Sequence, residues 1–368
     1  MKYKTGSSSI WWTWLLALLS VACDGDTGAM TEKAQIIFRM ELPPALEVST
    51  RVTTPPSLGG ISIENVWVVQ YNANNNNFIK AVAFTGEGTL DLNGNVLKIN
   101  TAGAEFSQVI SRFYVIVNAG TGFLDGFTGT EDELKAKTVS VSGITGELKL
   151  LTAGPIDYTP TSDGKVVVVA ALNRAYAKIS VKWQDTDDRG NFTISAMEVH
   201  NLPQKMALYT RGGGALNSNY PAGTDINTDT PSATGSMNSG TFYDFYMPEN
   251  LRGMGTASSF ADKGLKRYGP NGSLNYCTYI VLKGTYTYQK YLSDGTTPSG
   301  SAAPIDVEYH IYLGTNLIKD YNVQRGYWYQ LTLNLSGANT GDVRVRITDG
   351  KTAVFDKVEE IKHTIKFE

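Results

Sequence analysis

Three histidines and two cysteines are the side chains of this sequence best suited to metal binding or nucleophilic catalysis. His200, His310 and His363 are far apart in the chain, and none begins an H-x-x-x-H pair or a Cys/His metal spacing. No G-x-S-x-G motif or phosphate-binding glycine motif is present. The acidic pairs Asp187–Asp188 and Glu359–Glu360 are adjacent residues, which point to opposite faces of a strand. The sequence therefore predicts no enzyme, no metal site and no cofactor.

Cys277 lies in the run "LNYCTYIVLKGTY", which is rich in β-branched and aromatic residues. A cysteine in such a run is expected to be a small buried apolar side chain rather than a nucleophile. If Cys23 carries lipid, Cys277 has no partner for an intrachain disulfide, so we expect the cores to hold the fold.

Cys23 is the best candidate for a covalent modification. Two lysines near the start and a short apolar stretch, Ile10–Ala22, precede it, as in an export signal. The small residues Ser20 and Ala22 resemble a bacterial lipobox, in which the thiol is acylated and the cysteine becomes the first residue. Ser20 departs from the usual leucine, and the alternative is an ordinary secretory peptide cleaved nearby. Both predict export, with residues 1–22 as the signal.

Composition and charge argue against a nucleic-acid partner and favour two domains. The 368 residues are 42% hydrophobic and include 37 glycines and 20 tyrosines, which favours two domains with sizeable cores. The formal net charge is −3, and the basic residues are scattered singly. We therefore expect no nucleic-acid partner.

The dominant periodicity of the chain is two, which predicts short strands separated by Gly, Asn, Asp and Pro clusters. This pattern predicts an all-β protein of antiparallel sandwiches. The segment 129–137, "GTEDELKAK", predicts a short helix capped by Thr130, with Glu133 completing a capping box. The polar stretch Gly212–Gly240 is predicted to be one long surface loop.

A change of pattern predicts the domain boundary near Leu172. The all-apolar run Val166–Leu172 gives way to a strictly alternating run, 175–183. We expect an amino-terminal sandwich over 52–172 and a carboxy-terminal sandwich over 173–368.

The segment before the first sandwich predicts a strand with one apolar face. That face is formed by Ala34, Ile36, Phe38, Met40 and Leu42. Burying four large apolar side chains is worth roughly 6–12 kcal/mol, at about 1.5–3 kcal/mol each. Removal of the strand would open an apolar groove beside unpaired backbone, which is a binding site for another strand. The alternative is a permanent first strand of the sandwich.

Arg51 is a candidate cleavage site because its segment can neither coil nor pair for long. It lies between the prolines Pro43–Pro44 and Pro55–Pro56, and the residue after it is Val52 rather than proline. An arginine in a loop also often has no special role, and the pattern alone leaves both interpretations open.

Several longer motifs are shared between the two halves of the chain and a known family. The carboxy-terminal half carries "FYMPENLRG" (245–253), "TYIVLKGTY" (278–286) and "YHIYLGTNLIKDYNVQRGYWYQLTLNLSG" (309–337), and the amino-terminal half carries "VWVVQYN" (66–72) and "FYVIVNAG" (113–120). In order and approximate spacing these motifs resemble the fimbrillin family, the subunits of Bacteroidales surface fimbriae. The acidic start after Cys23 also resembles the surface-export signals of lipoproteins in such bacteria.

The resemblance implies two tandem transthyretin-like antiparallel β-sandwich domains. It further implies anchoring in the outer membrane by lipid, removal of a propeptide, 23–51, by an arginine-directed protease, and assembly with other fimbrial subunits at the cell surface by strand donation. It does not identify a receptor.

The carboxy-terminal segment 343–367 is the candidate donor. Ile361, Ile365 and Phe367 share one face of a predicted strand, with His363 between the first two, and could fill an apolar groove. The alternation slips in phase just before them, near Asp356–Glu360, which suggests a bulge or bend there. The alternative is that the segment forms two ordinary closing strands of the second sandwich.

A second functional hypothesis is a surface glycan-binding lipoprotein that does not polymerise. Such a protein needs exposed aromatic platforms, whereas Trp67, Trp183 and Trp328 lie in strand patterns typical of core packing. The remaining candidates for such platforms are Tyr209, Tyr220, Tyr268 and Tyr276.

Overall fold

The structure is a computed structural model, and residues 1–33 lie outside the part that it describes. The described residues are 35–41, 62–86, 90–93, 96–99, 101, 106–141, 148–161, 165–186, 190–210, 226–227, 232–259, 263, 276–288, 293, 297, 300, 303–316, 318–337, 340–349 and 365–366. Within these ranges, no helix has the length and apolar character needed to cross a membrane.

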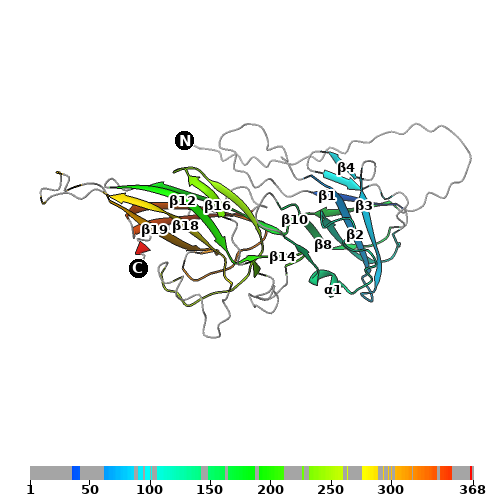
Figure 1. Cartoon of the computed structure of the whole chain (residues 1–368). Helices are drawn as coiled ribbons and strands as arrows, with labels where there is room; N and C mark the ends of the chain where they lie inside the picture. The colour runs from blue at the N-terminus through cyan, green and yellow to red at the C-terminus, as the bar shows by residue number, and fades with distance from the viewer. Residues whose placement is uncertain are drawn as a thin grey trace, which may run out of the picture. The chain divides into compact units, whose positions relative to one another are not determined.

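Residues 35–174 form two sheets around a shared core (Figure 1). The four-stranded sheet has the order β4-β5-β1-β9, formed by β1 (Gln35–Glu41), β4 (Leu90–Asn93), β5 (Val96–Ile99) and β9 (Lys165–Ala171). The five-stranded sheet has the order β10-β8-β6-β2-β3, formed by β2 (Asn65–Asn72), β3 (Phe78–Thr85), β6 (Ser111–Val117), β8 (Leu151–Tyr158) and β10 (Asn173–Arg174).

Residues 176–366 form a second pair of sheets. The five-stranded sheet has the order β17-β11-β20-β21-β22, formed by β11 (Tyr176–Asp185), β17 (Tyr243–Pro248), β20 (Tyr327–Gly337), β21 (Thr340–Asp349) and β22 (Ile365–Lys366). The four-stranded sheet has the order β16-β12-β18-β19, formed by β12 (Gly190–His200), β16 (Ser232–Met237), β18 (Tyr279–Tyr288) and β19 (Ala303–Tyr312). Two short pairs complete the strands: β13 (Leu202–Pro203) with β15 (Ile226–Asn227), and β7 (Thr138–Ser140) with β14 (Lys205–Ala207).

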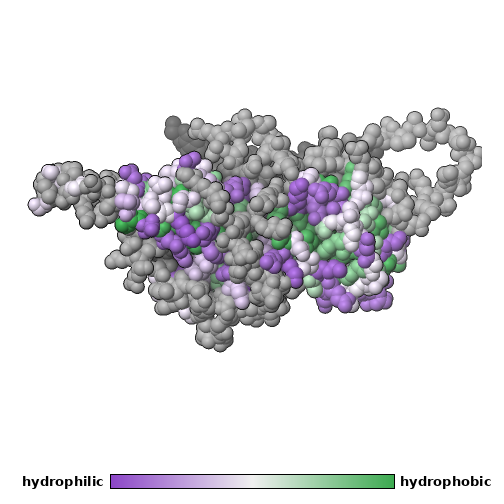
Figure 2. Space-filling model, viewed as in Figure 1, coloured by the Kyte–Doolittle hydropathy of each residue, from purple (hydrophilic) through white to green (hydrophobic). Residues whose placement is uncertain are grey.

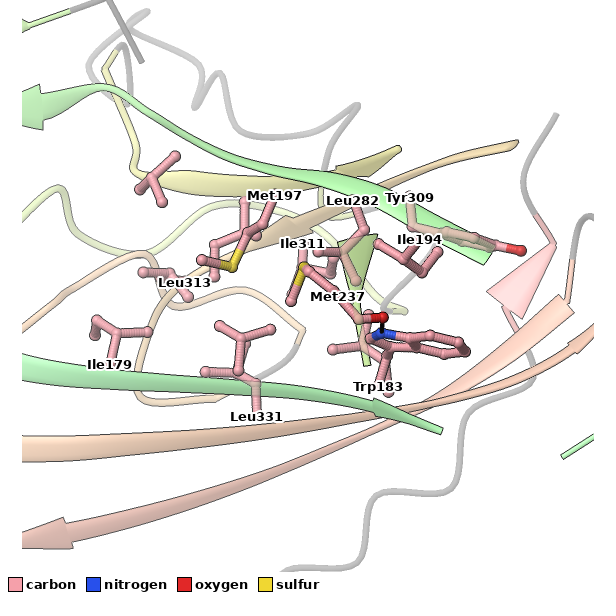
Figure 3. Packing of buried hydrophobic residues seen from close by; sticks show 14 of the residues in the cluster. Ile179, Trp183, Ile194, Met197, Met237, Leu282, Tyr309, Ile311, Leu313 and Leu331 are labelled. Carbon is pink, nitrogen blue, oxygen red and sulfur yellow. Dashed lines mark hydrogen bonds between the residues drawn. The ribbon is translucent and has the colours of Figure 1, made fainter. Parts of the chain in front are cut away.

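The core of the second pair lies between facing sheets. Figure 3 shows Ile179, Trp183 and Leu331 pointing toward Met197, Leu282 and Ile311. The indole nitrogen of Trp183 donates a hydrogen bond of 3.0 Å to the carbonyl oxygen of Met237. The largest aromatic side chain of this core therefore has its polar atom satisfied, as a buried tryptophan requires.

β12 shows how alternation and one glycine set the local structure. Phe192 and Ile194 face the core, the register with β18 shifts just after Ile194, and the alternation resumes in the other phase with Met197. Gly284 lies opposite this bulge, where a Cβ atom would be only 2.1 Å from the backbone oxygen of Thr193. The bulge therefore requires glycine at this position.

The all-β fold class is confirmed, but the sheets are not purely antiparallel. β1 pairs in parallel with β9, and β11 pairs in parallel with β20. Each of these pairs joins strands that are far apart in the chain. The period-two pattern carries no information on strand direction, so the sequence could not show these pairs.

Two local predictions have clear outcomes. The helix is confirmed as α1 (Glu131–Ala136), with Thr130 as the N-cap and a complete capping box to Glu133. The prediction of a single loop over Gly212–Gly240 is wrong, because β16 lies within it and pairs with β12. Its sequence, "SATGSM", lacks the large β-branched residues that signal a strand, and pairing with β12 overrides that weak propensity.

Candidate functional site

β1 lies inside its sheet, between two other strands. It pairs antiparallel with β5 over Phe38–Glu41 and in parallel with β9 over Gln35–Glu41. The strand therefore has neighbours along both edges, although it is the first strand of the chain that the structure describes.

Two side chains anchor β1 in the core. Phe38 and Met40 are both fully buried. The ring of Phe38 makes edge-to-face contacts with Phe113 at a centroid distance of 5.1 Å and with Phe106 at 5.4 Å. Such pairs add roughly 0.5–1.5 kcal/mol each to the gain from burial.

Removal of β1 would leave an elongated groove with backbone on both sides. The backbone groups of β5 and β9 that bond to β1 would lose their partners, and the rings of Phe106 and Phe113 would lose their cover. Unpaired strand edges next to exposed apolar surface are a template for a replacement strand.

The prediction of a one-sided strand is confirmed for its middle. Phe38 and Met40 face the core and Arg39 between them is exposed. Ile36 pairs with Val166 along the backbone. Ala34 and Leu42 lie outside the described residues.

Most of the other predicted site residues also lie outside the described residues. These are Cys23, Arg51, Val52, Ile361 and Phe367. Ile365 belongs to the short strand β22, where it pairs with Gly341 of β21. The structure thus describes most of the strand that we expect to be removable, β1, and its neighbours. The lipidation site and the cleavage site stay predictions.

The structure brings two histidines together that are 110 positions apart in the sequence. His200 stacks on Tyr279 at a centroid distance of 4.6 Å, and His310 stacks near the same ring at 5.7 Å. Each imidazole also meets a glutamate two residues away, Glu198 or Glu308. The described residues contain no group of three or more His, Cys, Asp or Glu side chains placed to hold a metal ion. The sequence alone did not predict this stack of His200, Tyr279 and His310, because one sequence does not show the register between strands.

The aromatic and thiol predictions can be checked directly. Trp67, Trp183 and Trp328 are buried, and so is Cys277. Tyr209 donates hydrogen bonds to the carbonyl oxygens of Val115 and Ala153, so it is a structural residue rather than a free platform.

Tyr276 is the remaining platform candidate that the structure describes. Its side chain is 39% exposed, and the guanidinium of Arg252 lies 5.8 Å from its ring centroid. Tyr220 and Tyr268 lie outside the described residues.

A buried lysine holds the loop that follows β19. The ammonium of Lys263 donates to the carbonyl oxygens of Tyr312 at 3.0 Å, Leu313 at 3.4 Å and Asn316 at 2.8 Å. The hydroxyl of Tyr321 donates in turn to the carbonyl oxygen of Lys263. Burial lowers the pKa of Lys263 to about 7, although the charge of Asp320 acts in the opposite direction.

Comparisons with known proteins found a family that matches part of the chain and solved structures that share its fold. Residues 245–333 match a protein family described as a domain of unknown function, DUF4906. This segment contains the loop that Lys263 holds and the motifs from "FYMPENLRG" to "YWYQLTL". None of the curated proteins matches the chain.

Two solved structures match most of the chain. A candidate cell adhesion protein from Parabacteroides distasonis has a TM-score of 0.54 at 13% identity, covering 86% of this chain and 96% of its own. A candidate cell adhesion protein from Bacteroides eggerthii has a TM-score of 0.50 at 15% identity, covering 88% and 98%. The chain shares their fold. The tip fimbrial protein Mfa3 from Porphyromonas gingivalis also aligns, with a TM-score of 0.47 at 11% identity over 85% of this chain and 98% of its own.

Proposed function

We propose that this chain is a subunit or adhesin of a cell-surface fimbria that assembles by strand exchange and is not an enzyme. In this proposal the protein is exported as a lipoprotein acylated at Cys23, held in the outer membrane, and cleaved after Arg51. The released strand is then replaced by a strand of another subunit. The fold shared with candidate adhesion proteins and the fimbrillin-like motifs support this role.

The observation that carries the proposal is the position of β1. β1 is paired along both edges, and its side chains Phe38 and Met40 are fully buried. It fills the groove between β5 and β9, here called the slot, which a strand of a second chain could occupy in the same way. Loss of an edge strand would only make the sheet narrower, whereas loss of β1 would open a gap between β5 and β9.

Cleavage is needed because of the tether. A strand attached to its own slot competes at an effective concentration in the millimolar range or above, so an incoming strand cannot displace it. Cutting after Arg51 turns the strand into a separate peptide that dilutes away once it leaves.

The proposed division of the chain follows the same scheme. Residues 1–22 form the signal and 23–51 the propeptide, followed by sandwiches over 52–172 and 173–368. The two pairs of sheets, each with its own core, support this division, and β10, just after the proposed boundary, still pairs with β8.

Limited trypsin treatment of the soluble precursor is expected to cut first after Arg51 and to leave a folded product beginning at Val52. Two basic residues of the folded part, Lys178 in β11 and Arg325 in the turn before β20, are held by ion pairs. Lys178 is buried in an ion pair of 2.9 Å with Asp244, and Arg325 pairs with Glu249 at 3.0 Å. Amino-terminal sequencing and intact mass of the product identify the first cut.

Arg51→Ala should block both this cut and polymerisation, and Arg51→Lys is the control that keeps a trypsin site. Early cutting at Lys178 or Arg325, or polymerisation of the Arg51→Ala protein as efficient as that of the wild type, would contradict the proposal.

Aspartate at Ile361, Ile365 and Phe367 is expected to abolish polymerisation of the cleaved protein while leaving the monomer folded. Each substitution would bring a carboxylate into the apolar slot at a cost of several kcal/mol. The matched control carries aspartate at the alternating positions Lys362, Thr364 and Lys366, which would face away from the slot. SDS-resistant ladders formed by the first variant would rule out this segment as the donor and would favour two closing strands.

A further inference from the structure

β9 combines an apolar surface with the edge of a sheet. It is the last strand in the order β4-β5-β1-β9. Val168 is 4% exposed and faces the core, whereas Val167 and Val169 on the opposite face are 54% and 50% exposed. On one face the strand therefore exposes Val167 and Val169, which lie side by side on that face. Its outer edge is not covered by any other described strand.

Another sheet edge of the same molecule is protected in the usual way. β19 ends its sheet as well, and it exposes Asp306 and Glu308. Charged side chains of this kind discourage pairing with other chains. β9 has no charged residue and no proline after Lys165, so its edge lacks this protection.

Figure 2 shows hydrophilic and hydrophobic residues interspersed over the described surface on the face in view.

The second pair of sheets shows what kind of element fits such an edge. In the chain, β11 is the first strand of its sheet and β1 is the first strand of its own. β20 pairs in parallel with β11, just as β9 pairs in parallel with β1. The far edge of β20 is covered by β21, which returns antiparallel directly after it. After β9 the chain instead enters β10, which pairs with β8 in the other sheet. The position that β21 takes beside β20 therefore has no counterpart beside β9 among the described strands.

We propose that the free edge of β9 pairs antiparallel with β9 of a second copy of this chain. With Val168 on the two-fold axis, Val167 of each copy lies opposite Val169 of the other. This pairing is self-complementary, as a two-fold interface must be. Lys165 then lies opposite Ala171, so no like charges meet across the new pair.

The size of this contact determines its role. One seven-residue strand per copy buries less than the roughly 1,200–2,000 Å² typical of stable complexes, so the pairing of two monomers is weak. Along a fibre the same contact repeats in every subunit, and linked weak contacts add up to strong association. If the proposed fimbrial function holds, this edge is a device for joining fibres side by side.

Sedimentation of the uncleaved Arg51→Ala protein over a concentration series tests the pairing without strand exchange. The wild-type edge is expected to give a monomer–dimer equilibrium. Val167→Lys and Val169→Lys should each weaken dimerisation at least tenfold, because each puts charge into the apolar contact. The matched control is Ile305→Lys, which introduces the same charge at an exposed position, 38% accessible, on the edge strand β19.

Circular dichroism and thermal melting confirm that each variant is folded. An Arg51→Ala protein with an unaltered β9 that stays monomeric up to about 1 mM, or valine variants that dimerise as tightly as the Ile305→Lys control, would overturn the proposal. Because none of these proteins can be cut at Arg51, failure here leaves the strand-exchange tests unaffected.

Discussion

Phe38→Ala is expected to lower the free energy of unfolding of the uncleaved protein by about 3–5 kcal/mol. The side chain is fully buried and packs edge-to-face on Phe106 and Phe113. Total stability of a domain is only about 5–15 kcal/mol, so the loss is a large fraction of it. Urea unfolding followed by tryptophan fluorescence measures the change.

The same substitution should accelerate assembly once the chain is cleaved. After the cut at Arg51, β1 stays in place only through its own contacts, and loss of the phenyl ring raises its dissociation rate. We expect the Phe38→Ala protein, treated with trypsin, to form polymers faster than the cleaved wild type. Arg39→Ala is the matched control, because Arg39 lies next to Phe38 but is exposed. A Phe38→Ala protein that is destabilised but assembles at the wild-type rate would show that release of β1 does not limit assembly.

Lys263→Met is expected to change the pH dependence of stability. The pKa of Lys263 is lowered to about 7 from its ordinary value of 10.5, chiefly by burial. Between these two values the unfolded chain binds more protons than the folded protein, so the wild type gains stability as pH rises. The gain is on the order of 1 kcal/mol per pH unit, and the methionine variant lacks it.

The measurement is the difference in unfolding free energy between wild type and variant from pH 7 to pH 9.5. At higher pH the buried tyrosines intervene, because burial raises the pKa values of Tyr71 and Tyr329 and the folded protein then loses stability. Lys319→Met is the control, since Lys319 is an exposed lysine of the loop that Lys263 holds. A constant difference across this range would mean that the lysine keeps its charge in the folded state, held by the carbonyl oxygens around it.

Much of the local structure could be predicted from the sequence. Alternation placed Phe38 and Met40 on one face of β1, and the spacing of Thr130 and Glu133 predicted the capped helix. Both signals are local, because they depend on residues two or three positions apart. The three tryptophans that were expected in cores are buried for the same reason.

Sequence patterns did not reveal the contacts between distant segments. Nothing in the run from Gln35 to Glu41 shows that its neighbours are β5 and β9, or that one of them runs parallel to it. The stack of His200, Tyr279 and His310 depends on register across three strands. The site of Lys263 depends on a loop about 50 residues further along the chain. Pairing and register are set by the whole fold, so one sequence leaves them undetermined.

The pairing of β1 along both edges has a mechanical consequence. A pull along the axis of a strand held on both sides loads its hydrogen bonds together in shear, whereas a strand peeled from an edge breaks them one at a time. A replacement strand in the same slot would meet β5 and β9 in the same way. The slot therefore suits a joint that must carry tension. If the chain polymerises as proposed, forced extension of single polymers should meet its greatest resistance where one subunit's strand lies in the next.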